Sequence, residues 1–159
     1  MGIPVDIPVG LIFEKGKGFL AWLIRTFTRS KYAHVSIVFN SGQVAWVCEA
    51  NADIGKVIQL RLSEFRAGKY LYVPTRVGMS QAVTDFLFTK VYGEPYDWWD
   101  LVRAGAGLQP KNQGYQCAEL VQKLFSVAGG SLPDAPTPQA ILDQLRKFPG
   151  HQEFEVEHP

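Results

Sequence analysis

The 159-residue chain is poor in the residues that build disulfide frameworks and metal centres. It contains two cysteines, Cys48 and Cys117, and three histidines. Two cysteines are too few for a disulfide-stapled fold and favour a reduced compartment. No set of four cysteine and histidine residues has the spacing of a zinc site. The sequence therefore calls for no metal, and we expect no organic cofactor.

The chain also lacks an excess of one charge and any long apolar run. Its 16 Lys and Arg residues balance 15 Asp and Glu residues, so nucleic acid is not an expected partner. No run is long enough to span a membrane, and residues 1–6 lack the basic and apolar segments of a signal peptide. We expect a cytoplasmic, single-domain protein over residues 1–159, with 149–159 as a loose tail.

What the sequence does contain is a series of β-strand patterns in its first half. Runs rich in β-branched and aromatic residues alternate with turn-forming residues such as Asn40-Ser41-Gly42. They predict five strands, over residues 9–13, 33–39, 43–50, 56–62 and 69–74.

Helical spacing of apolar residues follows mainly in the second half. We expect Ser80 to cap a helix that ends at Gly93, Asp97 to cap a short helix, and Thr137 to cap the last one. An earlier helix, over residues 19–27, is apolar on most faces and has basic neighbours. We expect this helix to pack in the protein core, and the alternative is that it lies on a membrane surface.

Cys117 lies in the first turn of a further predicted helix. Apolar residues recur from Cys117 to Ala128 at helical spacing, and Gly129-Gly130 ends the run. Free backbone N–H groups and the helix dipole favour a thiolate at that place, and the thiolate is the nucleophilic form. The alternative is a small buried residue with no chemical role.

A cysteine nucleophile needs a base and a group that orients the base. His151 and His158 lie in the predicted tail, so His34, the first polar residue of the second strand, is the candidate base. Glu49 on the next strand is a candidate partner for His34, and strand alternation places Cys48 on the opposite, core-facing side. The alternative for His34 is a purely structural role, and the alternative for Glu49 is an outward-facing carboxylate with no role in the site.

Four short motifs occur in one order along the chain. They are Tyr-Ala-His-Val-Ser-Ile-Val at 32–38, Val-Cys-Glu-Ala at 47–50, Gly-Glu-Pro-Tyr-Asp at 93–97 and Tyr-Gln-Cys-Ala-Glu-Leu-Val at 115–121. In this order they resemble the circularly permuted, papain-like hydrolases of the NlpC type, also described as YiiX-like. The resemblance implies an α+β fold, with an antiparallel sheet of about five strands packed against helices and the nucleophile at a helix N-terminus.

The resemblance also implies roles for individual residues. Cys117 would be the nucleophile, His34 its base and Glu49 the residue that orients the imidazole. The backbone N–H of Cys117 and the hydroxyl of Tyr115 would form the oxyanion hole. Tyr96 and Asp97 would be structural. Ala118 departs from the pattern, because many members of the group have serine there.

The implied function is a cysteine hydrolase that cleaves an amide bond in peptidoglycan-type peptides through a thioester, in a bacterial or phage-encoded protein. Related permuted folds act on lipids as acyl hydrolases or acyltransferases, which is the second hypothesis. The third is a binding module that keeps the cleft without catalysis. The expected partner is accordingly a peptide or acyl-group substrate.

Overall fold

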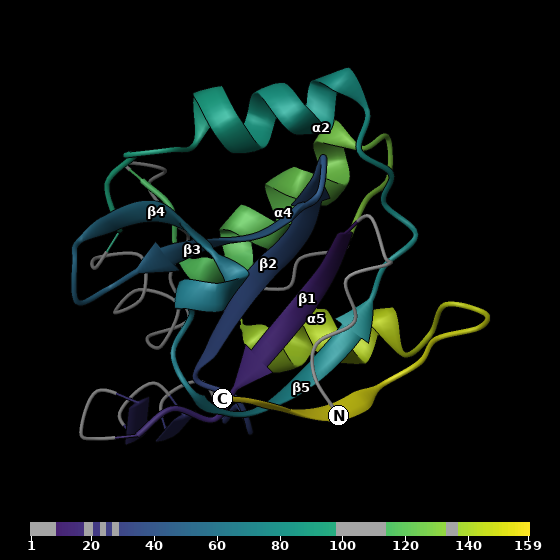
Figure 1. Cartoon of the computed structure of the whole chain (residues 1–159). Helices are drawn as coiled ribbons and strands as arrows, with labels where there is room; N and C mark the ends of the chain where they lie inside the picture. Colours follow the sequence, from purple (N-terminus) through teal and green to yellow (C-terminus); the bar gives the residue numbers. More distant parts are fainter. Residues whose placement is uncertain (1–8, 18–20, 23–24, 27–28, 98–113, 133–136) are drawn as a thin grey trace.

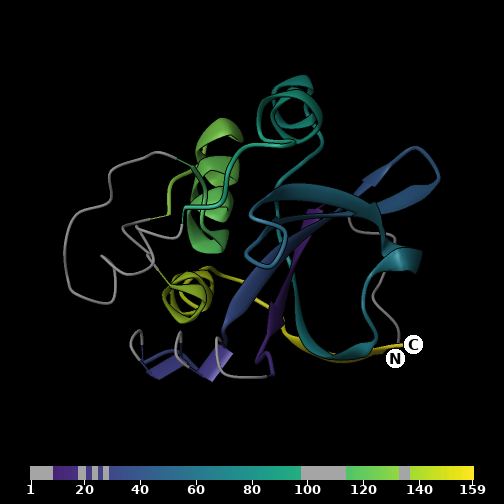
Figure 2. The same ribbon diagram turned by 90° about the vertical axis from the view of Figure 1, so that its left-hand side faces the viewer.

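The chain folds into a six-stranded antiparallel sheet with helices packed on one face (Figure 1 and Figure 2). This computed structural model describes residues 9–17, 21–22, 25–26, 29–97, 114–132 and 137–159. The α+β class agrees with the expectation from the sequence, and the sheet has one strand more than the five that were predicted.

The first five strands coincide with the predicted runs to within about two residues. The sheet has the order β4-β3-β2-β1-β5-β6, and each neighbouring pair is antiparallel. Gly42 and Gly55, in the turns after β2 and β3, have φ of 64° and 78°, which side-chain-bearing residues rarely adopt. The strands are β1 Val9–Glu14, β2 His34–Ser41, β3 Val44–Asn51, β4 Lys56–Arg61, β5 Gly68–Pro74 and β6 Phe154–His158.

The prediction of a loose tail over residues 149–159 is wrong. Phe154–His158 forms β6, which pairs with β5 so that Tyr70 lies opposite Val156. Val156 is buried in an apolar cluster with Tyr70 and Tyr72, and this burial fixes the strand. The run has only two apolar residues, Phe154 and Val156, so its alternation was too short to stand out in the sequence.

Two of the helices begin at predicted caps. Ser80 accepts a hydrogen bond from Val83 N (3.3 Å), and Thr137 accepts one from Ala140 N (3.1 Å). A short 3₁₀ turn, η1 Leu62–Glu64, follows β4. The helices are α2 Gln81–Asp85 with its π-helical continuation η2 Phe86–Lys90, α4 Cys117–Val127 and α5 Pro138–Leu145.

Two predicted helices fall partly or largely outside the described residues. Of the helix over 19–27, residues 21–22 and 25–26 are described and are helical. Of the short helix after Asp97, residues 98–102 lie outside the described part. Among the helices that are described, none combines the length and apolar character needed to cross a membrane.

Strand alternation divides the buried apolar residues into two clusters, one on each face of the sheet. On the helix-covered face, Ile37 and Cys48 pack with α4 residues such as Leu120. On the other face, Val38 and Val47 pack with a smaller set. Cys48 is therefore a core residue, as predicted, and the residue beside it, Glu49, faces the opposite side of the sheet.

Candidate active site

Cys117 is the first residue of α4 and is 6% exposed. The buried residues Leu120, Val121 and Leu124 hold the helix against β2 and β3. Gln116 precedes it in an extended conformation, and its backbone N–H donates to Glu119 Oε2 (3.2 Å). The thiol therefore lies where the helix dipole is positive and backbone N–H groups lack helical acceptors.

His34 is the first residue of β2 and contacts both other members of the predicted triad. Its Nε2 atom lies 3.0 Å from Glu49 Oε2, and its ring also makes a side-chain hydrogen bond with Cys117. Because Nε2 of His34 is hydrogen-bonded to Glu49, Nδ1 is the ring nitrogen that can bond with the thiol of Cys117. Burial alone would lower the pKa of His34, but the hydrogen bonds with Cys117 and Glu49 and the charges of both raise it to about 10.

The position of His34 at the end of its strand explains how it reaches two partners on opposite sides of the sheet. The register that pairs Ile37 with Cys48 sets Glu49 beside Ser36, on the face away from α4. Cys117 begins α4 on the other face. A residue in the middle of β2 would be confined to one face, whereas His34 is the first residue of the strand.

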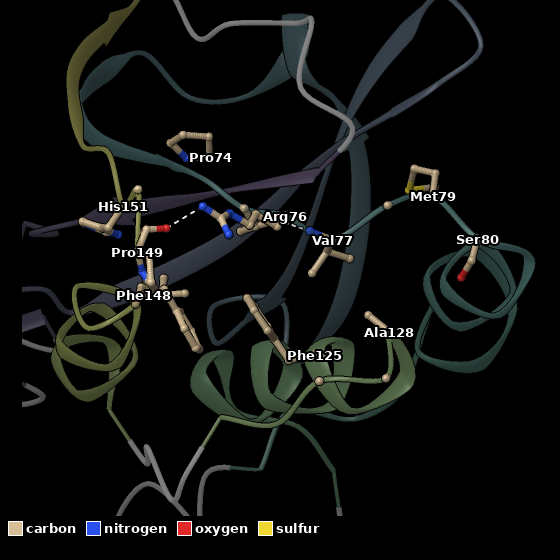
Figure 3. Close-up of a pocket in the computed structure, with 16 residues that line it drawn as sticks. Pro74, Arg76, Val77, Met79, Ser80, Phe125, Ala128, Phe148, Pro149 and His151 are labelled. Atoms are coloured by element: carbon tan, nitrogen blue, oxygen red, sulfur yellow. Dashed lines mark hydrogen bonds between the residues drawn. The ribbon is translucent and has the colours of Figure 1, made fainter.

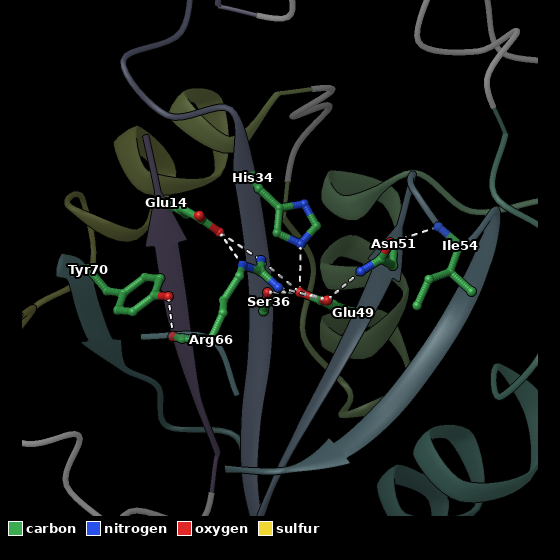
Figure 4. A network of polar contacts seen from close by, with 8 residues as sticks. All are labelled: Glu14, His34, Ser36, Glu49, Asn51, Ile54, Arg66 and Tyr70. Atoms are coloured by element: carbon green, nitrogen blue, oxygen red, sulfur yellow. Dashed lines mark hydrogen bonds and ion pairs between the residues drawn. The ribbon is translucent and has the colours of Figure 1, made fainter. Parts of the chain in front are cut away.

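Glu49 is a buried carboxylate, 1% exposed, that is saturated with hydrogen bonds (Figure 4). Oε2 lies near His34 Nε2 and accepts from Ser36 Oγ (2.9 Å). Oε1 accepts from Asn51 Nδ2 (2.8 Å). Arg66 adds two bonds, from Nη1 to Oε1 (3.0 Å) and from Nη2 to Oε2 (3.1 Å).

These contacts keep Glu49 ionised despite its burial. Burial alone would raise the pKa of Glu49, but the hydrogen bond and charge of His34, followed by those of Arg66, hold it well below its usual range. A permanently charged carboxylate both orients the imidazole and stabilises its protonated form. Together the three residues form a pair of opposite charges, Glu49 and His34, directly beside a thiol.

Ser36, Asn51 and Arg66 were not predicted as members of the site. Strand alternation places Ser36 on the face of His34, so its participation could have been inferred. Arg66 comes from the segment between η1 and β5, and it also binds Glu14 Oε2 through Nε (2.9 Å) and Nη2 (2.7 Å). No local pattern in the sequence links Arg66 to Glu49, because the fold alone brings them together.

The motifs that contain Tyr96 and Tyr115 lie side by side next to Cys117. Tyr115 N donates to Pro95 O (2.9 Å), and Asp97 N donates to Tyr115 O (3.3 Å). A side chain at Gly114 would collide with the carbonyl oxygen of Pro95, so this approach requires glycine.

The motif predicts a structural role for Tyr96, and the structure places Tyr96 near the thiol of Cys117. Burial raises the pKa of Tyr96 above its usual range, and the charge of Cys117 raises it further. The assignment of the Tyr115 hydroxyl to an oxyanion hole stays a prediction, as does the use of the Cys117 backbone N–H.

A cavity of about 1020 Å³ opens beside the polar network, and its lining includes His34, Asn51, Arg66 and Glu14. The His34 side chain is 19% exposed. The imidazole is thus accessible from the cavity while its carboxylate partner stays buried. No group of three or more His, Cys, Asp and Glu side chains in the described ranges is arranged to hold a metal ion.

Comparisons with known proteins support the fold. No protein-family model matches the chain, and no curated protein matches it. Among solved structures, the chain is similar to the metalloprotein YiiX of Escherichia coli O157:H7, with a TM-score of 0.55 and 19% sequence identity, over 98% of this chain and 99% of that one. At this identity the similarity shows a YiiX-like fold and nothing about the reaction.

Proposed function

We propose that this protein is a cysteine hydrolase that cleaves an amide bond, in peptidoglycan-type peptides, with Cys117, His34 and Glu49 as its triad. We further propose that its fold is a circularly permuted form of the papain-like, NlpC-type fold. The observation that carries the proposal is the contact of one imidazole with two partners. His34 hydrogen-bonds Cys117 on one side and the buried, ionised Glu49 on the other.

In the first half of the reaction, the Cys117 thiolate attacks the amide carbonyl carbon. The new S–C bond displaces the π electrons onto oxygen, where the Cys117 backbone N–H and the Tyr115 hydroxyl would stabilise the negative charge. When the C–N bond breaks, the His34 imidazolium gives its proton to the leaving nitrogen. The products of this half are a free amine and a thioester on Cys117.

In the second half, water hydrolyses the thioester. Neutral His34 takes a proton from water while the oxygen bonds to the thioester carbon, and the C–S bond then breaks to release the acid. The cycle restores the thiolate and the imidazolium. Glu49 stays ionised throughout, because its five hydrogen bonds within the described residues favour the charged form.

The similar structure is described as a metalloprotein, which raises the question of whether the residues of this site could bind a metal ion. The carboxylate of Glu49 has both oxygens committed to hydrogen bonds, two of them from the Arg66 cation. A cation so close to Glu49 would oppose a second, metallic one. The residues of this site therefore do not fit a metal centre, and the proposed mechanism uses none.

The function is tested by turnover on two substrate panels. Purified protein is incubated with peptidoglycan fragments and, separately, with phospholipid vesicles, and new amines or released fatty acids are quantified. We expect amine release from the fragments by wild type and by Cys48→Ala, and its loss in Cys117→Ala and His34→Gln.

Two outcomes would contradict the proposal. Fatty-acid release that depends on Cys117, without amine release, would support the lipid acyl hydrolase instead. Tight binding of fragments by wild type and Cys117→Ala alike, with no product from either panel, would support a non-catalytic binding module.

A further inference from the structure

A second cavity, of about 660 Å³, lies at the opposite end of α4 from Cys117 (Figure 3). Its walls are the segment that follows β5, the C-terminal end of α4 and the segment that follows α5. The α-helical rise puts it roughly 15 Å along α4 from the thiol. Its volume is within the range of small-molecule sites, about 300–1,000 Å³.

The floor of this cavity is apolar. Val77, Phe125 and Leu145 line it and are buried in the core behind it, and Met79 adds a flexible thioether. Figure 3 shows the Phe125 ring projecting from α4 towards the segment that carries Val77. Phe148 also lines the cavity and is 46% exposed, a large apolar surface left in contact with water. This floor suits a hydrocarbon chain.

Among the residues that line the cavity, the charged side chain is that of Arg76. Arg76 is at its edge, and no aspartate or glutamate is among the lining residues. Arg76 Nη2 donates to the carbonyl oxygen of Pro149 (2.5 Å), which holds the guanidinium at this edge. Within the described part of the chain Arg76 makes no ion pair. The other titratable lining residue, His151, is already bound to Glu153 (2.7 Å).

We propose that this cavity binds a small amphiphile with one carboxylate and a medium-length hydrocarbon chain, such as a fatty acid. The carboxylate would pair with the free N–H groups of Arg76, which is fixed in place by Pro149. The chain would cover Phe125, Val77 and Phe148. This site is independent of the proposed hydrolase, since it shares no residue with the triad.

The test uses sodium decanoate as the probe, below the concentration at which it forms micelles. Binding is measured by titration calorimetry and by ¹H–¹⁵N shifts of Gly78, Gly129 and Gly130, which line the cavity. Decanol serves as the uncharged comparison. We expect saturable decanoate binding with shifts at these glycines, and decanol binding that is at least fivefold weaker.

Two variants separate the charge from the apolar surface. Arg76→Gln should weaken decanoate binding about tenfold and leave decanol unchanged. Ala128→Phe, at an exposed lining position, fills the cavity and should weaken both ligands at least tenfold. Arg61→Gln, which removes an exposed arginine on β4 outside the cavity, should leave both affinities as in wild type.

The proposal is overturned by any of three results. These are no saturable binding of decanoate, binding whose shifts map away from Gly78, Gly129 and Gly130, or decanoate binding that Arg76→Gln and Ala128→Phe both leave unchanged. Circular dichroism of each variant establishes that a lost affinity is not lost folding.

Discussion

At the residue scale, the site is organised by a carboxylate that has no accessible oxygen left. Both carboxylate oxygens of Glu49 are hydrogen-bonded, by Ser36 and Asn51 as well as by His34 and Arg66. Such a carboxylate is fixed in position and charge. The imidazole that it holds therefore has one orientation available, with the second nitrogen towards Cys117.

The change Glu49→Gln should destabilise the fold as well as stop turnover. A glutamine amide cannot accept at both positions, and it leaves the Arg66 and His34 donors partly unpaired. Removing one partner of a buried ion pair lowers the free energy of unfolding by about 3–5 kcal/mol. Urea denaturation measures this loss. The control is Glu155→Gln, at an exposed position on β6, and a loss in Glu49→Gln no larger than in this control would contradict the prediction.

We expect Arg66 to position Glu49 through the two parallel hydrogen bonds of its planar guanidinium group. Arg66→Lys keeps the positive charge but cannot donate two parallel hydrogen bonds to the carboxylate. We expect it to lower the free energy of unfolding by roughly 1–2 kcal/mol and to reduce turnover with little change in KM. Steady-state kinetics and urea denaturation on one preparation provide both numbers. An increase in KM alone would instead indicate that Arg66 contacts the substrate.

The raised pKa of His34 makes stability depend on pH in a defined direction. The folded value, about 10, exceeds the ordinary value of about 6.5. The stabilisation is therefore complete below about pH 6.5 and disappears as the pH rises through about 10. Urea denaturation of wild type and His34→Gln should give a difference in unfolding free energy that shrinks across this range. A constant difference would contradict the raised pKa.

At the scale of elements, the approach of residue 114 to Pro95 fixes the entry into α4. Gly114→Ala should force the two segments apart and lower the free energy of unfolding by about 1–3 kcal/mol, because the added methyl group meets backbone atoms. It should also slow turnover, since Tyr115 and Cys117 follow directly. Thermal denaturation and kinetics test this, with Gly78→Ala as the control, where the methyl group meets nothing within 4 Å. Equal effects of the two changes would contradict it.

Elements with a strong local signal were predictable from the sequence, and weakly signalled ones were not. The first five strands and the caps at Ser80 and Thr137 were found because β-branched runs and capping hydroxyls act locally. The strand β6 was missed because one buried residue, Val156, decides it through contacts with β5. The π-helical end of the α2 helix was missed for a similar reason, since it has no local signature.

At the scale of the whole molecule, the triad could be anticipated and its environment could not. The order of the motifs named His34, Glu49 and Cys117, and the fold brings these three together. Arg66 and Glu14, which are 52 residues apart in sequence, meet only because β1 and β5 are neighbours in the sheet. The similarity to YiiX, at 19% identity, covers this same overall arrangement.

Iodoacetamide alkylation as a function of pH shows whether Cys117 and His34 act as a pair. Peptide mass mapping follows Cys117 and uses Cys48 as an internal reference. Burial, followed by the charge of Glu49, raises the pKa of Cys48 to about 12, so it should stay unlabelled. The variants are His34→Gln and, as the control, His151→Gln.

We expect Cys117 labelling that persists well below pH 8.5, the ordinary thiol range, in wild type and in His151→Gln. In His34→Gln the labelling profile should move towards that of an ordinary thiol. A profile centred near pH 8.5 and identical in all three proteins would show that the thiol and the imidazole do not act together, and would contradict the proposed hydrolase.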